Sequence, residues 1–138
     1  MRILQKSFLI TLLLSTALAC GGPAVHQITS TSRAPGAAGT ITVKKVSGGN
    51  RLMEIEIEHL PPPGTIANGA TVFVVWFQAG AGIPVMAGVL GYDEKKRKGE
   101  MQATSPGSAS MTVLITAEKA AGGAAPSEIV IVKRSIGS

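Results

Sequence analysis

The chain has 138 residues, of which 13 are Lys or Arg, 8 are Asp or Glu and one is Cys. This length suffices for one domain around one hydrophobic core, and a single cysteine excludes a disulfide within the chain. The formal charge of +5 at pH 7 is mild. Without a concentrated basic face, such a charge does not favour a nucleic-acid-binding protein.

Residues 1–19 have the layout of a bacterial export signal. Arg2 and Lys6 make the beginning positive, and a run over residues 8–14 follows that is apolar except for Thr11. This run falls short of the roughly 20 apolar residues that span a bilayer, so we expect a cleaved signal peptide. Removing Arg2 and Lys6 from the 13 basic side chains leaves 11 against 8 acidic ones, a net charge of +3.

The segment Ala17-Leu18-Ala19-Cys20 places small residues before a cysteine at the end of the apolar run. It resembles a bacterial lipobox, which implies that Cys20 carries a diacylglyceryl group and becomes the acylated first residue. The alternatives are an ordinary signal peptide cut after Ala19, or a buried free cysteine. Two or three acyl chains hold a protein on a membrane effectively permanently. Gly21 is not the aspartate that signals inner-membrane retention in some bacteria, which favours the outer membrane.

The segment after the cysteine mixes Gly, Pro, Ser, Thr and Ala without a sustained hydrophobic period, which is typical of a flexible linker. The roughly 100 residues that remain suffice for one domain. We therefore predict a signal peptide over residues 1–19, a lipidated flexible tether over residues 20–38 and a β-sandwich domain over residues 39–138.

From Thr40 onward, short segments rich in β-branched residues alternate with turn residues, which is typical of an all-β sandwich or barrel. Helical spacing is not sustained after the signal, and we expect at most one helical turn, over residues 118–121. The predicted strands number seven, over residues 40–46, 51–59, 70–78, 85–91, 98–104, 110–117 and 128–134.

The second predicted strand has one apolar and one acidic face: Met53, Ile55 and Ile57 alternate with Glu54, Glu56 and Glu58. A three-residue loop over residues 48–50 would bring the apolar residues of the first two strands to one face. This register sets Val43 opposite Ile55, and Ile41 opposite Ile57. It also sets Lys44 opposite Glu54 as an exposed ion pair.

The third predicted strand, ATVFVVWFQ over residues 70–78, is apolar on both faces, which places it in the middle of the fold. One face carries Phe73, Val75 and Phe77, and the other Val72, Val74 and Trp76. One face fills the core, whereas the other must be covered by a loop, the tether or a partner. Trp76 is therefore either a core residue or part of a binding surface.

Five motifs follow one another over residues 52–133. They are Leu60-Pro61, the apolar strand with Trp76, Pro84 followed by Val85-Met86-Ala87-Gly88-Val89, the strand over residues 113–118, and Gly122-Gly123 with Ala125-Pro126 running into residues 129–132. Their order resembles that of the extracytoplasmic C-terminal domain of the anti-sigma-K factor family. The resemblance implies a seven-stranded sandwich outside the cytoplasm, and we expect a single antiparallel immunoglobulin-like sandwich.

The sequence also departs from that family. Phe73-Val74-Val75-Trp76 stands where the family favours Tyr-x-Leu-Trp, and Glu118-Lys119 replaces Glu-Pro. The family's sigma-binding helical domain and transmembrane helix are absent from the sequence. The resemblance therefore implies a fold and not inhibition of a sigma factor.

Residues that carry chemistry are sparse. The histidines are His26 and His59, and Asp93 is the one aspartate, so neither zinc-ligand spacing nor a hydrolase arrangement is found. Consecutive glutamates on the face of the second strand are about 7 Å apart, too far to share one calcium ion without other ligands. We expect no catalytic residue, no metal and no cofactor.

The run DEKKRKG over residues 93–99 is a charged hairpin tip. It is either a simple exposed turn or a contact site for anionic lipid headgroups or an acidic partner. Its candidate contact residues are Lys95, Lys96, Arg97 and Lys98.

We therefore expect a non-enzymatic, membrane-anchored lipoprotein whose β-sandwich acts as a protein-contact or accessory module in the cell envelope. Its partners would be the membrane, through the lipid, and an envelope protein, with no nucleic acid. The alternatives are an envelope sensor domain, or a small-ligand carrier, which a large apolar cavity would favour. A hydrolase is a third possibility that clustered Ser, His and acid side chains would support.

Overall fold

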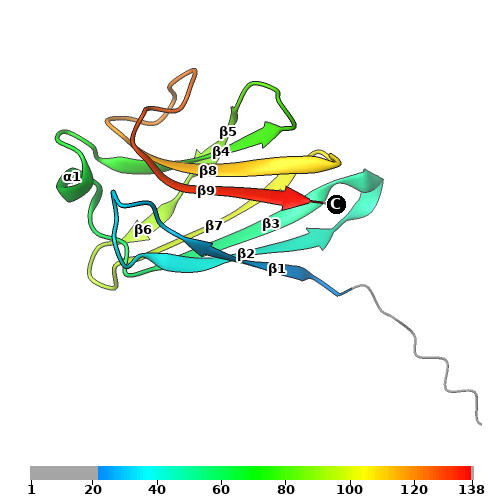
Figure 1. The fold of residues 1–138 in the computed structure, drawn as a ribbon, viewed down its shortest axis with the longest axis horizontal. Helices are drawn as coiled ribbons and strands as arrows, with labels where there is room; N and C mark the ends of the chain where they lie inside the picture. The colour runs from blue at the N-terminus through cyan, green and yellow to red at the C-terminus, as the bar shows by residue number, and fades with distance from the viewer. Residues whose placement is uncertain (1–21, 138) are drawn as a thin grey trace, which may run out of the picture.

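The computed structural model describes residues 22–137, which form two antiparallel sheets packed face to face (Figure 1). The strands are β1 (Ala24–Thr29), β2 (Ala38–Lys45), β3 (Arg51–Glu58), β4 (Val72–Ala79), β5 (Val85–Val89), β6 (Gly91–Asp93), β7 (Lys98–Ser105), β8 (Ser110–Glu118) and β9 (Val130–Gly137). The helical elements are a 3-10 turn, η1 (Ser47–Gly49), and a single turn, α1 (Pro63–Ile66). Neither of them is long and apolar enough to span a bilayer.

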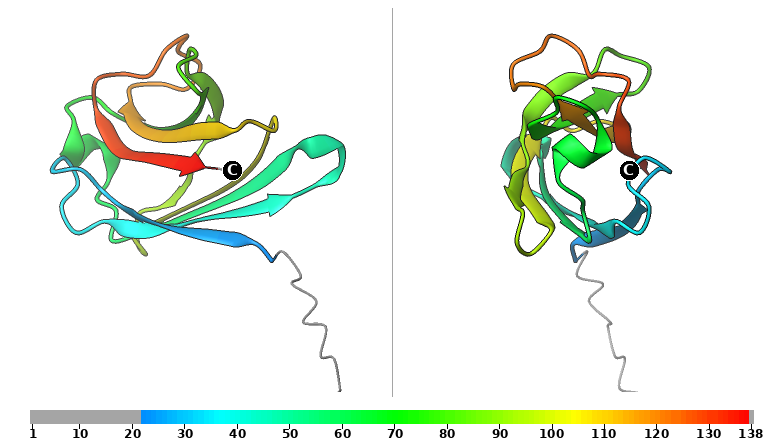
Figure 2. Two further views of the ribbon diagram at one scale, coloured as in Figure 1. Left: turned by 45° about the vertical axis from the view of Figure 1, so that its right-hand side comes forward. Right: turned by 90° about the vertical axis from the view of Figure 1, so that its left-hand side faces the viewer.

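The five-stranded sheet has the order β1-β2-β3-β7-β6, and the four-stranded sheet the order β5-β4-β8-β9. Figure 2 shows the two sheets as separate layers, with the segment between β8 and β9 passing over the outer side of the four-stranded sheet. The side chains between the layers form one core, which includes Ile41, Met53 and Ile57 from one sheet and Phe73, Val75, Val113 and Ile115 from the other. Alternation along each strand thus buries every second residue between the sheets.

All seven predicted strands are present, but the count of seven was too low. The predicted strand over residues 85–91 is divided into β5 and β6, which belong to different sheets. Leu90 lies between them, 2% exposed, and its N–H donates to the Phe73 carbonyl oxygen at 2.9 Å. The second additional strand is β1. The helical turn expected over residues 118–121 is not found, since β8 extends to Glu118 and α1 is the single α-helical turn within residues 22–137.

The prediction of a flexible tether was wrong for residues 24–38. Strand β1 pairs with β2 along its whole length, from Ala24 opposite Val43 to Thr29 opposite Ala38. Ile28, Ala34 and Ala37 are buried in the core. The chain is also tied to β9, because the Thr31 N–H donates to the Ile131 carbonyl oxygen at 2.7 Å. The folded domain therefore begins at about Ala24 and not at residue 39.

The register of the β2–β3 hairpin differs by two residues from the prediction. Val43 pairs with Met53, and Ile41 with Ile55, so the apolar residues share one face as expected. The turn has the predicted length of three residues but lies one residue earlier, over residues 47–49, because the Val46 N–H donates to the Asn50 carbonyl oxygen at 3.0 Å. A shift of two residues preserves the face on which every side chain lies.

Candidate functional site

The predicted basic tip is the turn between β6 and β7. Lys95, Lys96 and Arg97 are exposed there. The Lys96 N–H donates to Asp93 Oδ1 at 3.0 Å, and the Arg97 carbonyl oxygen accepts from the Leu60 N–H at 2.9 Å. These bonds fix the path of the backbone, and the basic side chains project from it into solvent.

The basic tip lies at the end of the domain opposite the point where the chain enters. Strand β1 begins opposite Val43 of β2, and Val43 pairs in turn with Met53 near the start of β3. At the other end of β3, Ile57 pairs with Gly99, directly after the tip. Figure 1 shows the same separation, with β1 entering at the right and the β6–β7 turn at the left.

Lys98 does not share the exposure of the other three basic residues. Its Nζ lies 3.0 Å from Glu56 Oε1 and 2.9 Å from Glu100 Oε1. The hydrogen bonds to Glu100 and Glu56 raise the pKa of the Lys98 ammonium well above its ordinary value. Lys98 thus offsets part of the negative charge of Glu56 and Glu100 and is not free to bind a partner.

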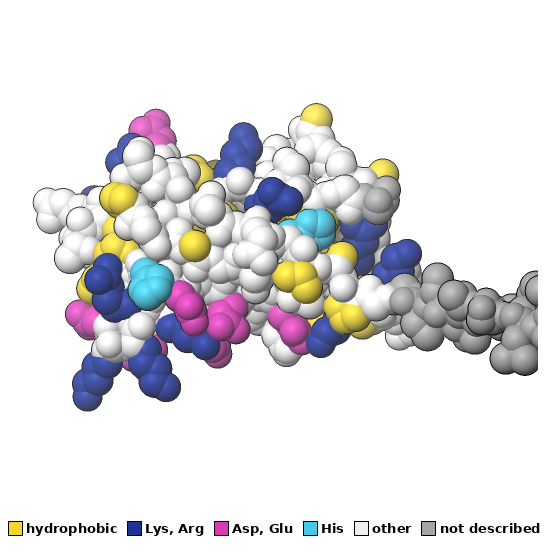
Figure 3. Space-filling view, turned by 60° about the horizontal axis from the view of Figure 1, so that its bottom comes forward, with side chains coloured by type: hydrophobic (Ala, Val, Ile, Leu, Met, Phe, Trp, Pro, Cys, Tyr) yellow, Lys and Arg dark blue, Asp and Glu magenta, His cyan; other side chains and the backbone are white. Residues whose placement is uncertain are grey.

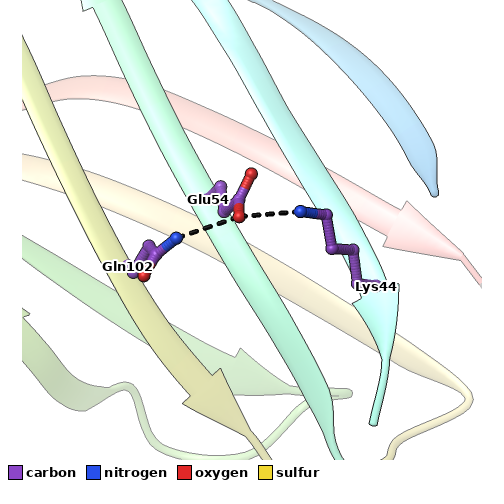
Figure 4. Close-up of polar contacts among 3 residues, drawn as sticks. All are labelled: Lys44, Glu54 and Gln102. Carbon is purple, nitrogen blue, oxygen red and sulfur yellow. Dashed lines mark hydrogen bonds and ion pairs between the residues drawn. The ribbon is translucent and has the colours of Figure 1, made fainter.

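The expected pairing of Lys44 with Glu54 does form, although the two residues are diagonal neighbours (Figure 4). Lys44 Nζ and Gln102 Nε2 each lie 2.9 Å from Glu54 Oε1. The hydrogen bond from Lys44 is the main reason why the pKa of Glu54 is below its ordinary value of 4.5. Within residues 22–137, no three His, Cys, Asp or Glu side chains are grouped closely enough to hold a metal ion.

The lowered pKa of Glu54 predicts how the free energy of unfolding depends on pH. A group with a depressed folded-state pKa stabilises the fold above its unfolded pKa, and this contribution is lost as the pH falls through the folded pKa. We expect Glu54→Gln to weaken the acid dependence of the free energy of unfolding below about pH 4.5. Urea unfolding at a series of pH values measures this pH dependence of the free energy of unfolding. Glu58→Gln is the control, because Glu58 shares the acidic face but has no ion pair among the described residues; identical pH profiles for the two variants would contradict the role of Glu54.

Trp76 is buried, 1% exposed, on the outer face of the four-stranded sheet. Its Nε1–H donates to Thr116 Oγ1 at 2.9 Å, and the Thr116 hydroxyl donates to Glu118 Oε1 at 2.6 Å. The Ser127 N–H donates to the same carboxylate oxygen at 2.8 Å. This chain of hydrogen bonds fastens the segment between β8 and β9 over the tryptophan. A loop of the domain itself therefore covers the second apolar face of β4.

The two histidines lie in different parts of the domain, and only His59 is on the same side as Asp93. His26 pairs with Ile41 in the middle of β1, whereas His59 follows β3 at the end near the basic tip, and Asp93 caps the tip itself. No hydrogen bond or ion pair in the described chain joins either histidine to a carboxylate or a serine. Within residues 22–137, neither histidine is therefore held by a hydrogen bond as a base beside a serine or a carboxylate.

Two features escaped prediction from the sequence. The first is the Trp76–Thr116–Glu118–Ser127 hydrogen-bond chain, whose only signal is a Thr and a Glu two residues apart on an apolar strand. The second is a groove beside the chain entry, lined by basic residues from the β2–β3 hairpin.

The predicted lipid attachment site, Cys20, lies outside the described residues. The described chain begins at Gly22, two residues later. Comparisons with protein-family models, with curated proteins and with solved structures gave no match, so any assignment of function depends on this chain's own residues and geometry.

Proposed function

We propose that the chain is an exported lipoprotein, anchored by acylated Cys20, whose β domain works by protein contact in the cell envelope without catalysing a reaction. The observation that most supports this proposal is that the lipobox-like segment ends only four residues before β1 (Ala24–Thr29). Such a segment would hold the whole folded domain close to the membrane surface. The residue after the cysteine, Gly21, supports the outer membrane as the location.

We also propose that the domain is an immunoglobulin-like sandwich. The neighbouring strands β2-β3-β7-β6 and β5-β4-β8-β9 follow the order A-B-E-D and C′-C-F-G of that fold, with β1 added at one edge. The motif order that resembles the anti-sigma-K C-terminal domain supports the same topology. Sandwiches of this type present loops at both ends as contact surfaces.

The basic tip is the proposed contact site for an acidic envelope protein. Lys95, Lys96 and Arg97 are exposed, whereas Lys98 is engaged by Glu56 and Glu100. The tip lies at the end away from the chain entry. A lipid anchor at Cys20 would therefore hold the tip away from the anchoring bilayer, which favours a protein partner over the headgroups of that bilayer.

The anchor is tested by Cys20→Ser in the full chain. We expect the wild-type protein to sediment with the membrane and its mature N-terminal peptide to carry the mass of the diacylglyceryl and acyl groups. The variant should move to the soluble fraction, because no acyl chains remain to hold it. Membrane association that is unchanged in the variant would contradict the anchor. Density-gradient separation of the two membranes tests the proposed location.

The contact site is tested by Lys95→Glu/Lys96→Glu in the lipidated protein, crosslinked in its native envelope. We expect a specific crosslinked product with the wild type and about a tenfold or greater loss with the variant, because like charges facing each other cost several kcal/mol. Arg33→Glu/Lys119→Glu makes the same charge change in two other exposed loops and should preserve the product. An equal yield from both variants would contradict a role for the tip.

One observation favours the alternative of a small-ligand carrier. A groove of about 430 Å³ between the β4–β5 and β7–β8 loops is lined by Phe77, Ile83, Val85, Met86, Pro106 and Met111 among others. This volume falls within the range of small-molecule sites. Saturable binding of a fluorescent fatty acid that Ile83→Ser weakens would favour this alternative.

A further inference from the structure

A groove of about 400 Å³ lies where the chain enters the domain, between the start of β1, the β2–β3 hairpin and the end of β9. Its basic lining residues are Lys44, Lys45 and Arg51. Val25, 58% exposed, and Val46, 39% exposed, lie on β1 and in the hairpin turn beside it. We call this groove, together with Val25 and Val46, the entry face. Figure 3 shows basic and hydrophobic side chains gathered at the end of the domain next to the atoms drawn in grey.

The entry face contains a pair of like charges that have no ion-pair partner among residues 22–137. Lys45 and Arg51 are directly opposite each other in the β2–β3 ladder. Such a like-charge pair is destabilising by itself, and neither residue has an ion-pair partner in residues 22–137. An anion bound at the entry face would relieve this repulsion.

The acidic residues of the domain lie elsewhere. Only Glu54 is near the entry face, and Lys44 pairs with it at 2.9 Å. The other acidic residues lie farther from the entry. Glu56 and Glu58 are in the far part of β3, Asp93 and Glu94 are in the basic tip, and Glu100 is near the start of β7. Glu118 ends β8, and Glu128 lies in the loop that follows it. The described domain is therefore positive at the end where the chain enters and mixed in charge at the other.

We propose that the entry face docks on an anionic phospholipid bilayer, with Lys45 and Arg51 at the lipid phosphates and Val25 and Val46 in the headgroup layer. This inference rests on the proposed anchor at Cys20, which precedes Gly22 by two residues, a reach of at most about 7 Å. Acyl chains so close would hold the entry face at the membrane surface. Basic residues near an anionic surface each contribute about a fivefold factor to binding, and the exposed valines supply the apolar part of an interfacial contact.

The test uses the lipidated full-length mature protein in vesicles of phosphatidylcholine, with or without phosphatidylglycerol. Lipidation blocks the Cys20 thiol, so Val46→Cys supplies a single site for a fluorescent label, with Lys95→Cys at the basic tip as the control site. We expect a lipid-borne quencher to quench the label at residue 46 several-fold more than the label at residue 95. The difference should shrink without phosphatidylglycerol and at high ionic strength.

A charge reversal then distinguishes a loss of membrane docking from a loss of fold stability. Lys45→Glu replaces the like-charge pair with an attractive one, so the thermal midpoint should stay or rise while quenching at residue 46 falls about fivefold or more. Lys95→Glu makes the same charge change at the tip and should preserve that quenching.

The outcomes distinguish the two proposals. Equal quenching at residues 46 and 95 in a protein that floats with the vesicles would overturn the docking and leave the anchor intact. The docking would also be overturned if Lys45→Glu left the quenching at residue 46 unchanged. Failure to float would overturn the anchor, and the docking with it.

Discussion

Replacing Trp76 by alanine is expected to lower the free energy of unfolding by about 3–5 kcal/mol, as large-to-small changes of buried aromatic residues do. The side chain is 1% exposed and packs with Val74 and Leu114 on the outer face of the four-stranded sheet. Its removal leaves a cavity under the β8–β9 segment, and Thr116 loses its donor. Urea unfolding followed by circular dichroism measures the effect, since the variant contains no tryptophan.

The control, Trp76→Phe, keeps an aromatic ring but removes the donor to Thr116 Oγ1. We expect a smaller loss, about 1–3 kcal/mol, from the hydrogen bond and the reduced volume. The wild-type tryptophan should fluoresce at short wavelength, as a residue shielded from water does. A loss below about 1 kcal/mol for the alanine variant, which is typical of surface positions, would contradict the burial of Trp76.

The two apolar faces of β4 illustrate what the sequence can and cannot predict. Alternation alone places Phe73, Val75 and Phe77 on one face and Trp76 on the other, and both assignments agree with the structure. What covers Trp76 depends on the β8–β9 loop, which is rich in Gly, Ala and Ser and has no hydrophobic period. Its position depends on the contacts of Glu118 with Thr116 and Ser127, which are formed only in the folded chain.

Strand β1 escaped prediction for a related reason. It is an edge strand with Ile28 as its one buried residue, and Val25 faces solvent. An edge strand held mainly by backbone hydrogen bonds has little hydrophobic pattern to reveal it. The following Ser, Thr, Pro and Gly residues are not a linker but a tight connection, in which Ala34 and Ala37 are buried.

The candidate sites were predictable to different degrees. A run of four basic residues identifies the hairpin tip. Only the folded structure shows that one of them, Lys98, pairs with Glu56, which is distant in the sequence but lies on the neighbouring strand. The entry face joins residues from β1, the β2–β3 hairpin and β9. No local pattern relates these segments, and the unneutralised pair of Lys45 and Arg51 depends on a register that was predicted two residues away.

Gly39→Ala is expected to cost about 3 kcal/mol or more of stability, beyond the usual range for surface substitutions. Gly39 pairs with Ile57 across the β2–β3 ladder, and an added Cβ would overlap the backbone carbonyl oxygen of Glu56. Backbone atoms of two paired strands cannot yield as a side chain does, so β2 must move away from β3. Because β1 is paired only through β2, the added strand and the chain entry would be displaced with it.

Gly137→Ala is the matched control, since its added Cβ meets nothing within 4 Å near the end of β9. We expect it to change the free energy of unfolding by less than about 0.5 kcal/mol, as at other open surface positions. Chemical denaturation of both variants measures the difference. In the lipidated Gly39→Ala protein, displacement of β1 should also reduce the quenching of a label at residue 46. Equal stability of the two variants would contradict the close approach of β2 to β3 on which both the edge strand and the entry face depend.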